Sequence, residues 1–149
     1  MECSRLNNIK GLMYLWSVDN LLIAGQPQAE SFEELKKLGI TKVFNMRSEN
    51  EMDFTFEKEA CERLGLEYIQ FPLVENGQLI KESCEKLSSM INETDKWFIH
   101  CGSANRIAGW LITYLTKYRK MDFNKACEIA MNNGLSNPAF IEQAKIISA

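Results

Sequence analysis

The chain has 149 residues, of which 46% are hydrophobic and 25% are charged, and its formal net charge is −3. This length suits a single core, so we expect residues 1–149 to form one domain. A net negative charge argues against general binding to nucleic acid or to an acidic membrane, because both attract basic surfaces. Any attraction for an anion must then be local.

The cysteines, the N-terminus and the apolar runs predict where the protein resides. There are five cysteines and no Cys-x-x-Cys pair, which favours a reducing compartment over a disulfide scaffold and gives no zinc signature. The N-terminus lacks the pattern of a secretion signal, although a signal cleaved beforehand would leave the same sequence. No apolar run approaches the ~18 residues that span a bilayer. We therefore expect a cytoplasmic protein, with its oligomeric state left open.

Strands and helices alternate along the hydrophobic pattern, which predicts an α/β fold with a small, mostly parallel sheet. Ser31 and Glu34 have the spacing of a capping box, and the helix that they begin should end near Gly39. Residues 1–10 look loosely held. The predicted strands are 12–18, 21–24, 41–46, 66–71 and 96–99, and the predicted helices are 31–39, 54–64, 79–91, 106–118, 122–131 and 137–146.

The stretch from Trp97 to Trp110 carries the strongest signal for function. An apolar strand leads through His100 into Cys101, and Arg106 begins a buried helix. Backbone N–H groups in such a turn, together with the helix dipole, favour a bound anion and also stabilise a thiolate. The loop residues that would hold the anion are Gly102, Ser103, Ala104, Asn105 and Arg106.

Cys101 is therefore predicted to be a nucleophile at the floor of a phosphate-binding P-loop, where it would form a phosphocysteine. The planar fork of Arg106 can bind two oxygens of the anion. A cysteine at a strand end is often only a core residue, but the flanking His100 and Arg106 favour the chemical role. This role requires a sulfur that solvent can reach and a guanidinium turned toward it.

Three motifs in this order resemble a known family. They are the Gly-Gln-Pro turn at 25–27, the strand end at 43–47 with its Asn45 and Arg47, and the Cys101 loop. Over residues 20–135 the chain resembles cysteine-dependent phosphatases of the protein tyrosine phosphatase superfamily. It is most similar to the bacterial dual-specificity-like group called DUF442, or beta-lactamase-hydrolase-like phosphatases.

The resemblance implies a three-layer phosphatase fold and a phosphoric monoester hydrolase that needs no cofactor and no metal. The substrate would be a phosphorylated protein or small molecule. Most relatives have five residues between Cys and Arg, whereas this chain has four, as do the DUF442-like group and rhodaneses. Ile107 also stands where many phosphatases carry Ser or Thr. A rhodanese-like sulfurtransferase and a non-catalytic phosphate-binding module therefore remain alternatives.

Three alternatives remain open for the general acid that would protonate the leaving group. In the phosphatases that the chain resembles, an Asp on the loop after the preceding strand protonates the leaving group. Glu75, in the loop 73–78, stands at about that place. Asp53 is a second candidate, although it also suits the N-cap of the next helix, and the third assignment has no dedicated acid. Asp95 precedes the Cys101 strand and should lie at the opposite end of the sheet.

Two further side chains are expected near the loop. Arg47 ends a strand, where sites of open α/β sheets gather, so it should either touch substrate or pair with Glu49 or Glu51. His100 should orient the loop by hydrogen bonding, since alternation along the strand turns its ring away from Cys101.

Overall fold

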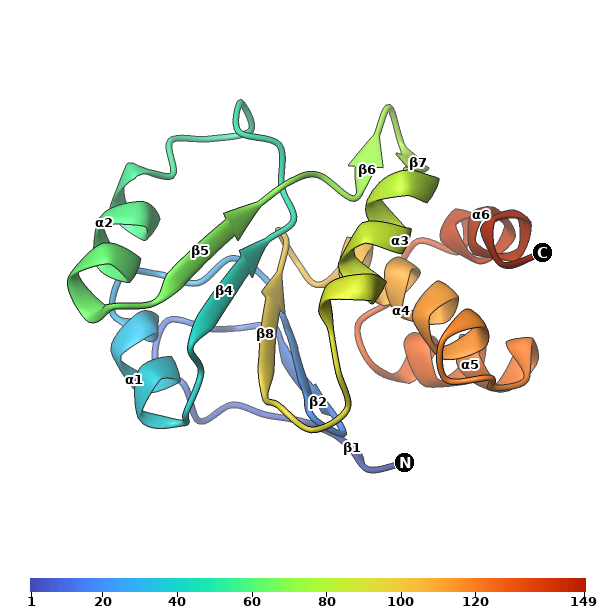
Figure 1. The fold of residues 1–149 in the computed structure, drawn as a ribbon, viewed down its shortest axis with the longest axis horizontal. Coiled ribbons are helices and arrows are strands. Elements are labelled where there is room, and N and C mark those ends of the chain that lie inside the picture. The colour runs from blue at the N-terminus through green and yellow to red at the C-terminus, as the bar shows by residue number, and fades with distance from the viewer.

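The computed structural model describes residues 1–149 and is built around a six-stranded sheet of order β1-β2-β3-β8-β4-β5 (Figure 1). The pairs β1–β2 and β2–β3 are antiparallel, and the pairs β3–β8, β8–β4 and β4–β5 are parallel. The mostly parallel sheet is thereby confirmed. The strands are β1 Cys3–Arg5, β2 Leu15–Val18, β3 Leu21–Ala24, β4 Lys42–Asn45, β5 Glu67–Gln70 and β8 Trp97–His100.

Six helices cover the two faces of the sheet and make three layers, as expected. The first two lie on one side and the other four on the opposite side (Figure 1). No helix in the structure is both long enough and apolar enough to cross a membrane. The helices are α1 Ser31–Lys37, α2 Thr55–Leu64, α3 Lys81–Met90, α4 Asn105–Lys117, α5 Phe123–Asn132 and α6 Ala139–Ser148.

Alternation along β8 assigns each side chain of the central strand to one layer. Trp97, Ile99 and Cys101 belong to a 26-residue core cluster beneath α3–α6, whereas Phe98 belongs to a 13-residue cluster beneath α1 and α2. His100 is two residues after Phe98, so its side chain lies on the same face of the sheet, the α2 side. All four residues of β8 are buried, as expected for a strand flanked by parallel neighbours and covered on both faces.

The parallel strands β3, β8 and β4 end at the same edge of the sheet. Ala24 and Asn45 are both in register with His100. The Cys101 amide donates to the Ala24 carbonyl at 3.1 Å, and the Met46 amide donates to the His100 carbonyl at 2.8 Å. The segments that follow these three strands contain all three sequence motifs, so the topology brings the motifs together.

Three local predictions differ from the structure. Ser31 is the first residue of α1 rather than its cap, because its hydroxyl donates to the Lys10 carbonyl and Glu34 accepts from the Lys10 amide. Residues 3–5 form β1, since they pair with β2 at the edge of the sheet. Within the predicted loop 73–78 lies a small hairpin of β6 Val74–Glu75 and β7 Gln78–Leu79.

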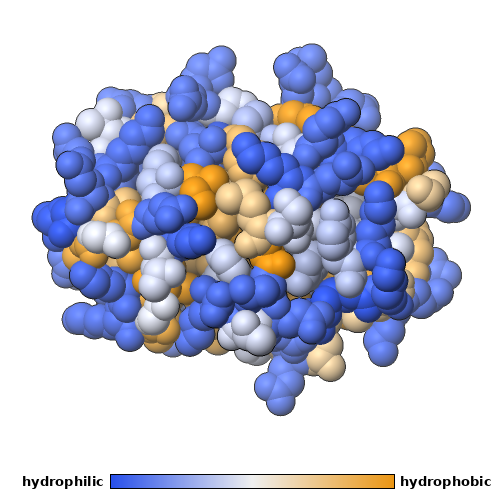
Figure 2. All heavy atoms as spheres, viewed as in Figure 1, coloured by the Kyte–Doolittle hydropathy of each residue, from blue (hydrophilic) through white to orange (hydrophobic).

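The surface shows no extended apolar face in the view of Figure 1. Hydrophilic residues cover most of it, and the hydrophobic ones appear between them in small groups (Figure 2). The arrangement agrees with a core that is divided between the two sides of the sheet.

Candidate active site

The loop from Cys101 to Arg106 connects β8 to α4 and is held by the Gly-Gln-Pro turn. The Gln26 amide donates to the Gly102 carbonyl at 3.0 Å. A side chain on Gly25 would place its Cβ 2.8 Å from that same carbonyl oxygen, so glycine is the residue that lets the two segments approach. The first sequence motif therefore shapes the loop of the third.

Ala104 gives the loop its turn into the helix. It precedes α4 with φ +74°, in the left-handed region that costs a residue with a Cβ about 1–2 kcal/mol. The amides of Gly102, Ser103, Asn105 and Arg106 donate to no acceptor in the protein, and the first hydrogen bond of the helix runs from the Ala108 amide to the Ala104 carbonyl. Free N–H groups at the start of a 13-residue helix suit an oxyanion.

Arg106 reaches back toward Cys101 and is at the same time held by a carboxylate. The hydrogen bond to Glu51 is the largest cause of a raised pKa of Arg106, and the nearby Cys101 adds to the rise. Its Nη1 and Nη2 donate to the two oxygens of Glu51 at 2.8 and 2.9 Å. A Cβ on Gly102 would lie 3.5 Å from Arg106 Nη2, so the guanidinium lies against the backbone of the loop, next to Cys101 in sequence.

Glu51 joins two arginines at the mouth of the loop. Besides Arg106 it accepts from Arg47 Nε at 2.9 Å and from the Ser48 amide at 2.7 Å. Partial burial by itself raises the pKa of Glu51, but the donors outweigh it and lower the pKa to about 2. Of the expectations for Arg47, the structure shows the pair with Glu51, and its guanidinium also lies 5.5 Å from the centre of the Phe54 ring.

Cys101 is only 1% exposed, so the requirement for a sulfur open to solvent is not met in this conformation. The residues around it are more accessible, since Gly102 and Arg106 are partly exposed and Ser103 is exposed. The floor of the loop is therefore covered while its rim is open. Ile107 is fully buried in the core, where the hydroxyl of many phosphatases would stand.

His100 belongs to a buried pair with Glu57 of α2. Its Nε2 lies 2.6 Å from Glu57 Oε2, and neither side chain is exposed. Its Nδ1 lies 3.3 Å from the Cys101 carbonyl oxygen, which can only accept a proton donor. Nδ1 therefore carries a proton, and one further proton is shared in the short contact with Glu57.

A network of polar side chains connects this pair to Arg106. Gln26 donates through Nε2 to Glu57 Oε1 at 2.7 Å and accepts from Arg47 Nη1 at 3.0 Å. Arg47 then binds Glu51, which binds Arg106. This network thus reaches the loop from both ends, at the residue before Cys101 and at Arg106.

Glu57 is the side chain of this network that the sequence interpretation missed, whereas Glu51 was expected only as a partner of Arg47 and Gln26 only as part of the Gly-Gln-Pro turn. For Glu57 a signal existed, because the other buried residues of α2 are Ala60 and Cys61, at spacings i+3 and i+4. A carboxylate on the apolar face of a helix is rare unless it has a partner. On the same face of α2, burial raises the pKa of the Cys61 thiol to about 12.

The candidate acids lie in different settings. Glu75 is exposed at the end of β6, and Gln143 of α6 holds its hairpin by bonds to the Leu79 amide and the Gly77 carbonyl. Hydrogen bonds from Thr55 lower the pKa of Asp53, which makes it a helix-start residue rather than a proton donor. Asp95 lies before β8, where Asn92 donates to its carboxylate, at the opposite end of the sheet as expected.

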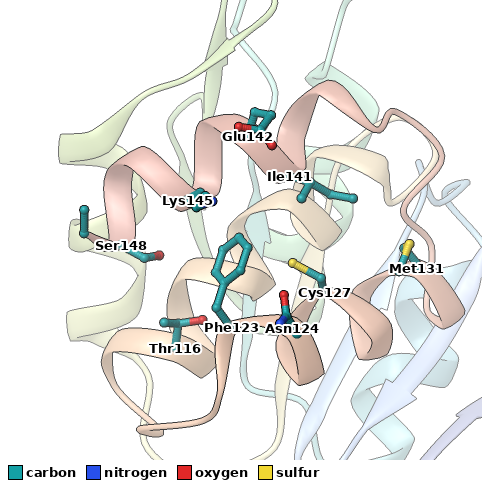
Figure 3. Close-up of a pocket in the computed structure, with 10 residues that line it drawn as sticks. Thr116, Phe123, Asn124, Cys127, Met131, Ile141, Glu142, Lys145 and Ser148 are labelled. Atoms are coloured by element: carbon teal, nitrogen blue, oxygen red, sulfur yellow. The ribbon is translucent and has the colours of Figure 1, made fainter.

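The two largest cavities lie on the α4–α6 side of the sheet. One of about 580 Å³ includes Ser103 of the loop in its wall. The larger, of about 740 Å³, lies between the later turns of α4, α5 and α6, where the side chains of Thr116, Phe123 and Cys127 point into it (Figure 3). The larger cavity contains no residue of the candidate site.

No protein-family model matches the chain, and no curated protein matches it in sequence. Solved structures do match it. A DUF442 protein from Shewanella putrefaciens CN-32 superposes with a TM-score of 0.71 at 19% identity, covering 95% of this chain and 93% of its own. TpbA of P. aeruginosa in complex with pTyr gives 0.69 at 14% identity, covering 90% and 82%. PTPMT1 in complex with PI(5)P gives 0.70 at 18% identity, covering 86% and 89%. The chain thus has the fold of protein tyrosine phosphatase-like phosphatases.

Proposed function

We propose that this chain, which has a protein tyrosine phosphatase-like fold, is a cysteine-dependent phosphatase that hydrolyses phosphate monoesters. The observation that carries the proposal is a loop that starts at Cys101, whose amides have no acceptor in the protein and whose backbone at Gly102 lies against the Arg106 guanidinium. A nucleophile, a fixed guanidinium and oriented N–H donors are the elements that phosphoryl transfer to sulfur needs.

The reaction has two steps. In the first, the Cys101 thiolate attacks phosphorus, a P–S bond forms, the P–O bond to the leaving group breaks, and the leaving oxygen takes a proton. In the second, water attacks phosphorus and loses a proton, the P–S bond breaks, and inorganic phosphate leaves. Arg106 and the loop amides hold the equatorial oxygens in both steps, where they stabilise the charge of the transition state.

Glu75 is proposed as the residue that protonates the leaving group. Its hairpin follows β5 and lies at the carboxyl edge of the parallel strands, the same edge as the Cys101 loop (Figure 1). Glu75→Gln should slow an alkyl phosphate, whose leaving alkoxide needs the proton, by about 10²-fold or more, and slow an aryl phosphate much less. Equal effects on both substrates would remove Glu75 from this role, and Asp53→Asn is the matched control.

Access to the sulfur requires that the mouth of the loop open. Glu51 holds both terminal nitrogens of Arg106, and its carboxylate would repel an incoming phosphate. Turnover therefore includes a step in which Glu51 releases Arg106, at least in part. The buried pair of His100 and Glu57 stays in place and positions the Cys101 carbonyl.

The substrate belongs to the phosphorylated compounds. Structural neighbours have been solved with pTyr and with PI(5)P, so the fold accommodates phosphate esters of a protein side chain and of a lipid headgroup. On these grounds we propose a phosphorylated small molecule or phosphoresidue as substrate.

The deciding experiment is a panel of phosphate monoesters assayed with the wild-type chain and with Cys101→Ser. The proposal expects hydrolysis that Cys101→Ser abolishes, and a phosphocysteine that mass spectrometry detects after rapid quenching. Thiosulfate:cyanide transfer, measured beside it, should be absent. Cys101-dependent sulfur transfer without hydrolysis, or phosphate binding without Cys101-dependent turnover, would overturn the proposal in favour of a sulfurtransferase or a binding module.

A further inference from the structure

A second groove lies beside the Cys101 loop, on the side of the sheet's antiparallel strands. It is the cavity of about 580 Å³, and the residues of its wall that matter here are Arg5, Tyr14, Trp16, Ser103, Asn132 and Ser136. Its volume is within the range of ordinary ligand pockets. β1 ends at Arg5 and β2 begins one residue after Tyr14, and the antiparallel pairing brings both to the edge where β3 and β8 end.

Both walls of the groove are attached to the loop. On one side, Tyr14 lies 3.1 Å from the position of a Cβ on Gly25, the residue that packs against the Gly102 carbonyl. On the other side, Asn105 Oδ1 accepts from the amides of Ser136 and Asn137 at 2.9 and 3.0 Å. Ser103 belongs to the loop and to the groove, so a ligand at Cys101 can extend directly into it.

Arg5 supplies the charge of the groove. Its guanidinium lies 4.7 Å from the Trp16 ring centre and 5.8 Å from that of Tyr14, and these rings are stacked on each other. Its Nη2 donates to the Met13 carbonyl at 3.3 Å, which leaves other N–H groups free. Stacking of this kind fixes the planar fork, so less conformational entropy is lost when an anion binds.

Arg5 differs from every other arginine of the chain. Arg47 and Arg106 bind Glu51, Arg63 binds Glu33, and Arg119 binds Asp19 and Glu93. Arg5 has no carboxylate within ion-pair distance, in a protein with an excess of acidic residues. A guanidinium that stacks on aromatic rings and has no internal carboxylate partner, beside a phosphate-type loop, is suited to an external anion.

We propose that this groove binds a second anionic group of the substrate, a phosphate or a carboxylate, while the phosphate to be cleaved sits at Cys101. The inference rests on the proposed function and narrows it. The substrate class is then a small soluble phosphate monoester with a second anionic substituent. Tyr14 and Trp16 form the wall for its carbon skeleton, and Arg5 with Ser103 and Ser136 holds the anion.

The test compares a hexose monophosphate with the corresponding hexose bisphosphate on Arg5→Gln. The matched control is Arg63→Gln, which removes an exposed arginine of α2 on the other side of the sheet. Arg5→Gln should raise KM for the bisphosphate roughly fivefold to tenfold with kcat retained, as expected when one charged hydrogen bond is lost. KM for the monophosphate should stay within about twofold, and Arg63→Gln should change neither. An equal effect on both substrates, or none on the bisphosphate, would overturn the proposal.

Binding to Cys101→Ser separates the failure of this inference from failure of the proposed function. Calorimetry should show the bisphosphate binding more tightly than the monophosphate, with the difference removed by Arg5→Gln. If that difference in affinity appears but the wild type turns over no substrate, the groove is confirmed as an anion site and the phosphatase proposal is refuted. If turnover depends on Cys101 but Arg5→Gln raises KM only for a phosphopeptide with acidic residues, the assignment of a small molecule as substrate is overturned.

Discussion

Replacing Glu57 by Gln tests whether the buried pair of Glu57 and His100 supports the Cys101 loop. The carboxylate is fully buried and accepts from His100 and Gln26 at 2.6 and 2.7 Å. Gln has the same shape, so no cavity forms. Its amide oxygen can still accept from Gln26, but its NH₂ group must then face the His100 ring, which holds only with a neutral ring that carries its proton on Nδ1.

The expected cost follows from the bonds that change. A charge-assisted hydrogen bond becomes a neutral one, which should lower the free energy of unfolding by about 1–1.5 kcal/mol, the difference between the two kinds of bond. Glu57→Leu leaves the buried Nε2 of His100 without a partner and removes one acceptor of Gln26, and for this change we expect the free energy of unfolding to fall by about 3–5 kcal/mol. For a chain of this length, 1 kcal/mol corresponds to about 2–4 °C in Tm, so Glu57→Gln should melt roughly 2–6 °C lower.

The assay is urea unfolding followed by tryptophan fluorescence, together with the rate of Cys101 alkylation across pH. Glu59→Gln, an exposed position on the same helix, is the control and should change stability by less than about 0.5 kcal/mol. Glu57→Gln should also shift the pH profile of alkylation, because the proton shared between His100 and Glu57 is lost and the ring behind the Cys101 carbonyl becomes neutral. If Glu57→Gln unfolds like Glu59→Gln and its alkylation profile is unchanged, the reasoning about the buried pair is refuted.

Two other predictions concern the mouth and the floor of the loop. The pKa of Glu51 is about 2 in the folded chain, against 4.5 for a glutamate in the unfolded chain. The contribution of Glu51 to stability is therefore complete above pH 4.5 and is lost as the pH falls toward 2. The difference in unfolding free energy between the wild type and Glu51→Gln should therefore shrink between about pH 5 and pH 2, and a constant difference in that window would contradict the assignment. Gly25→Ala would place a Cβ 2.8 Å from the Gly102 carbonyl oxygen, which should cost about 1–3 kcal/mol in urea unfolding and lower kcat, since the loop must shift. Wild-type kcat in a stably folded Gly25→Ala chain would show that this close contact does not shape the loop.

Local signals in the sequence were sufficient to predict most of the strands and helices around the site. The apolar run before His100 predicted β8, and the buried run after Arg106 predicted α4. Gly65 ends α2 in the left-handed conformation, and Asp122 caps α5 by accepting from the Lys125 amide, both as expected. These features succeed because each depends on residues within one turn of helix or a few positions of strand.

Prediction failed where a side chain binds a distant segment instead of its neighbours. Ser31 has the spacing of a cap, but its hydroxyl donates to Lys10, 21 residues away. Residues 3–5 look polar and loose, but the edge of the sheet offers them a strand to pair with. Backbone pairing across the sheet provides hydrogen bonds that local composition does not reveal.

The sequence by itself determined the α/β alternation, the strand-loop-helix with Cys101 and Arg106, and the edge of the sheet at which the motifs meet, because these follow from periodicity and from the rule for parallel strands. Only the tertiary structure decided that Glu51 holds Arg106, that Glu57 pairs with His100, that Cys101 is covered, and that Arg5 has no acidic partner. The first two contacts join residues 55 and 43 positions apart. Contacts at such separations depend on how the layers pack, and hydrophobic periodicity carries no information about them.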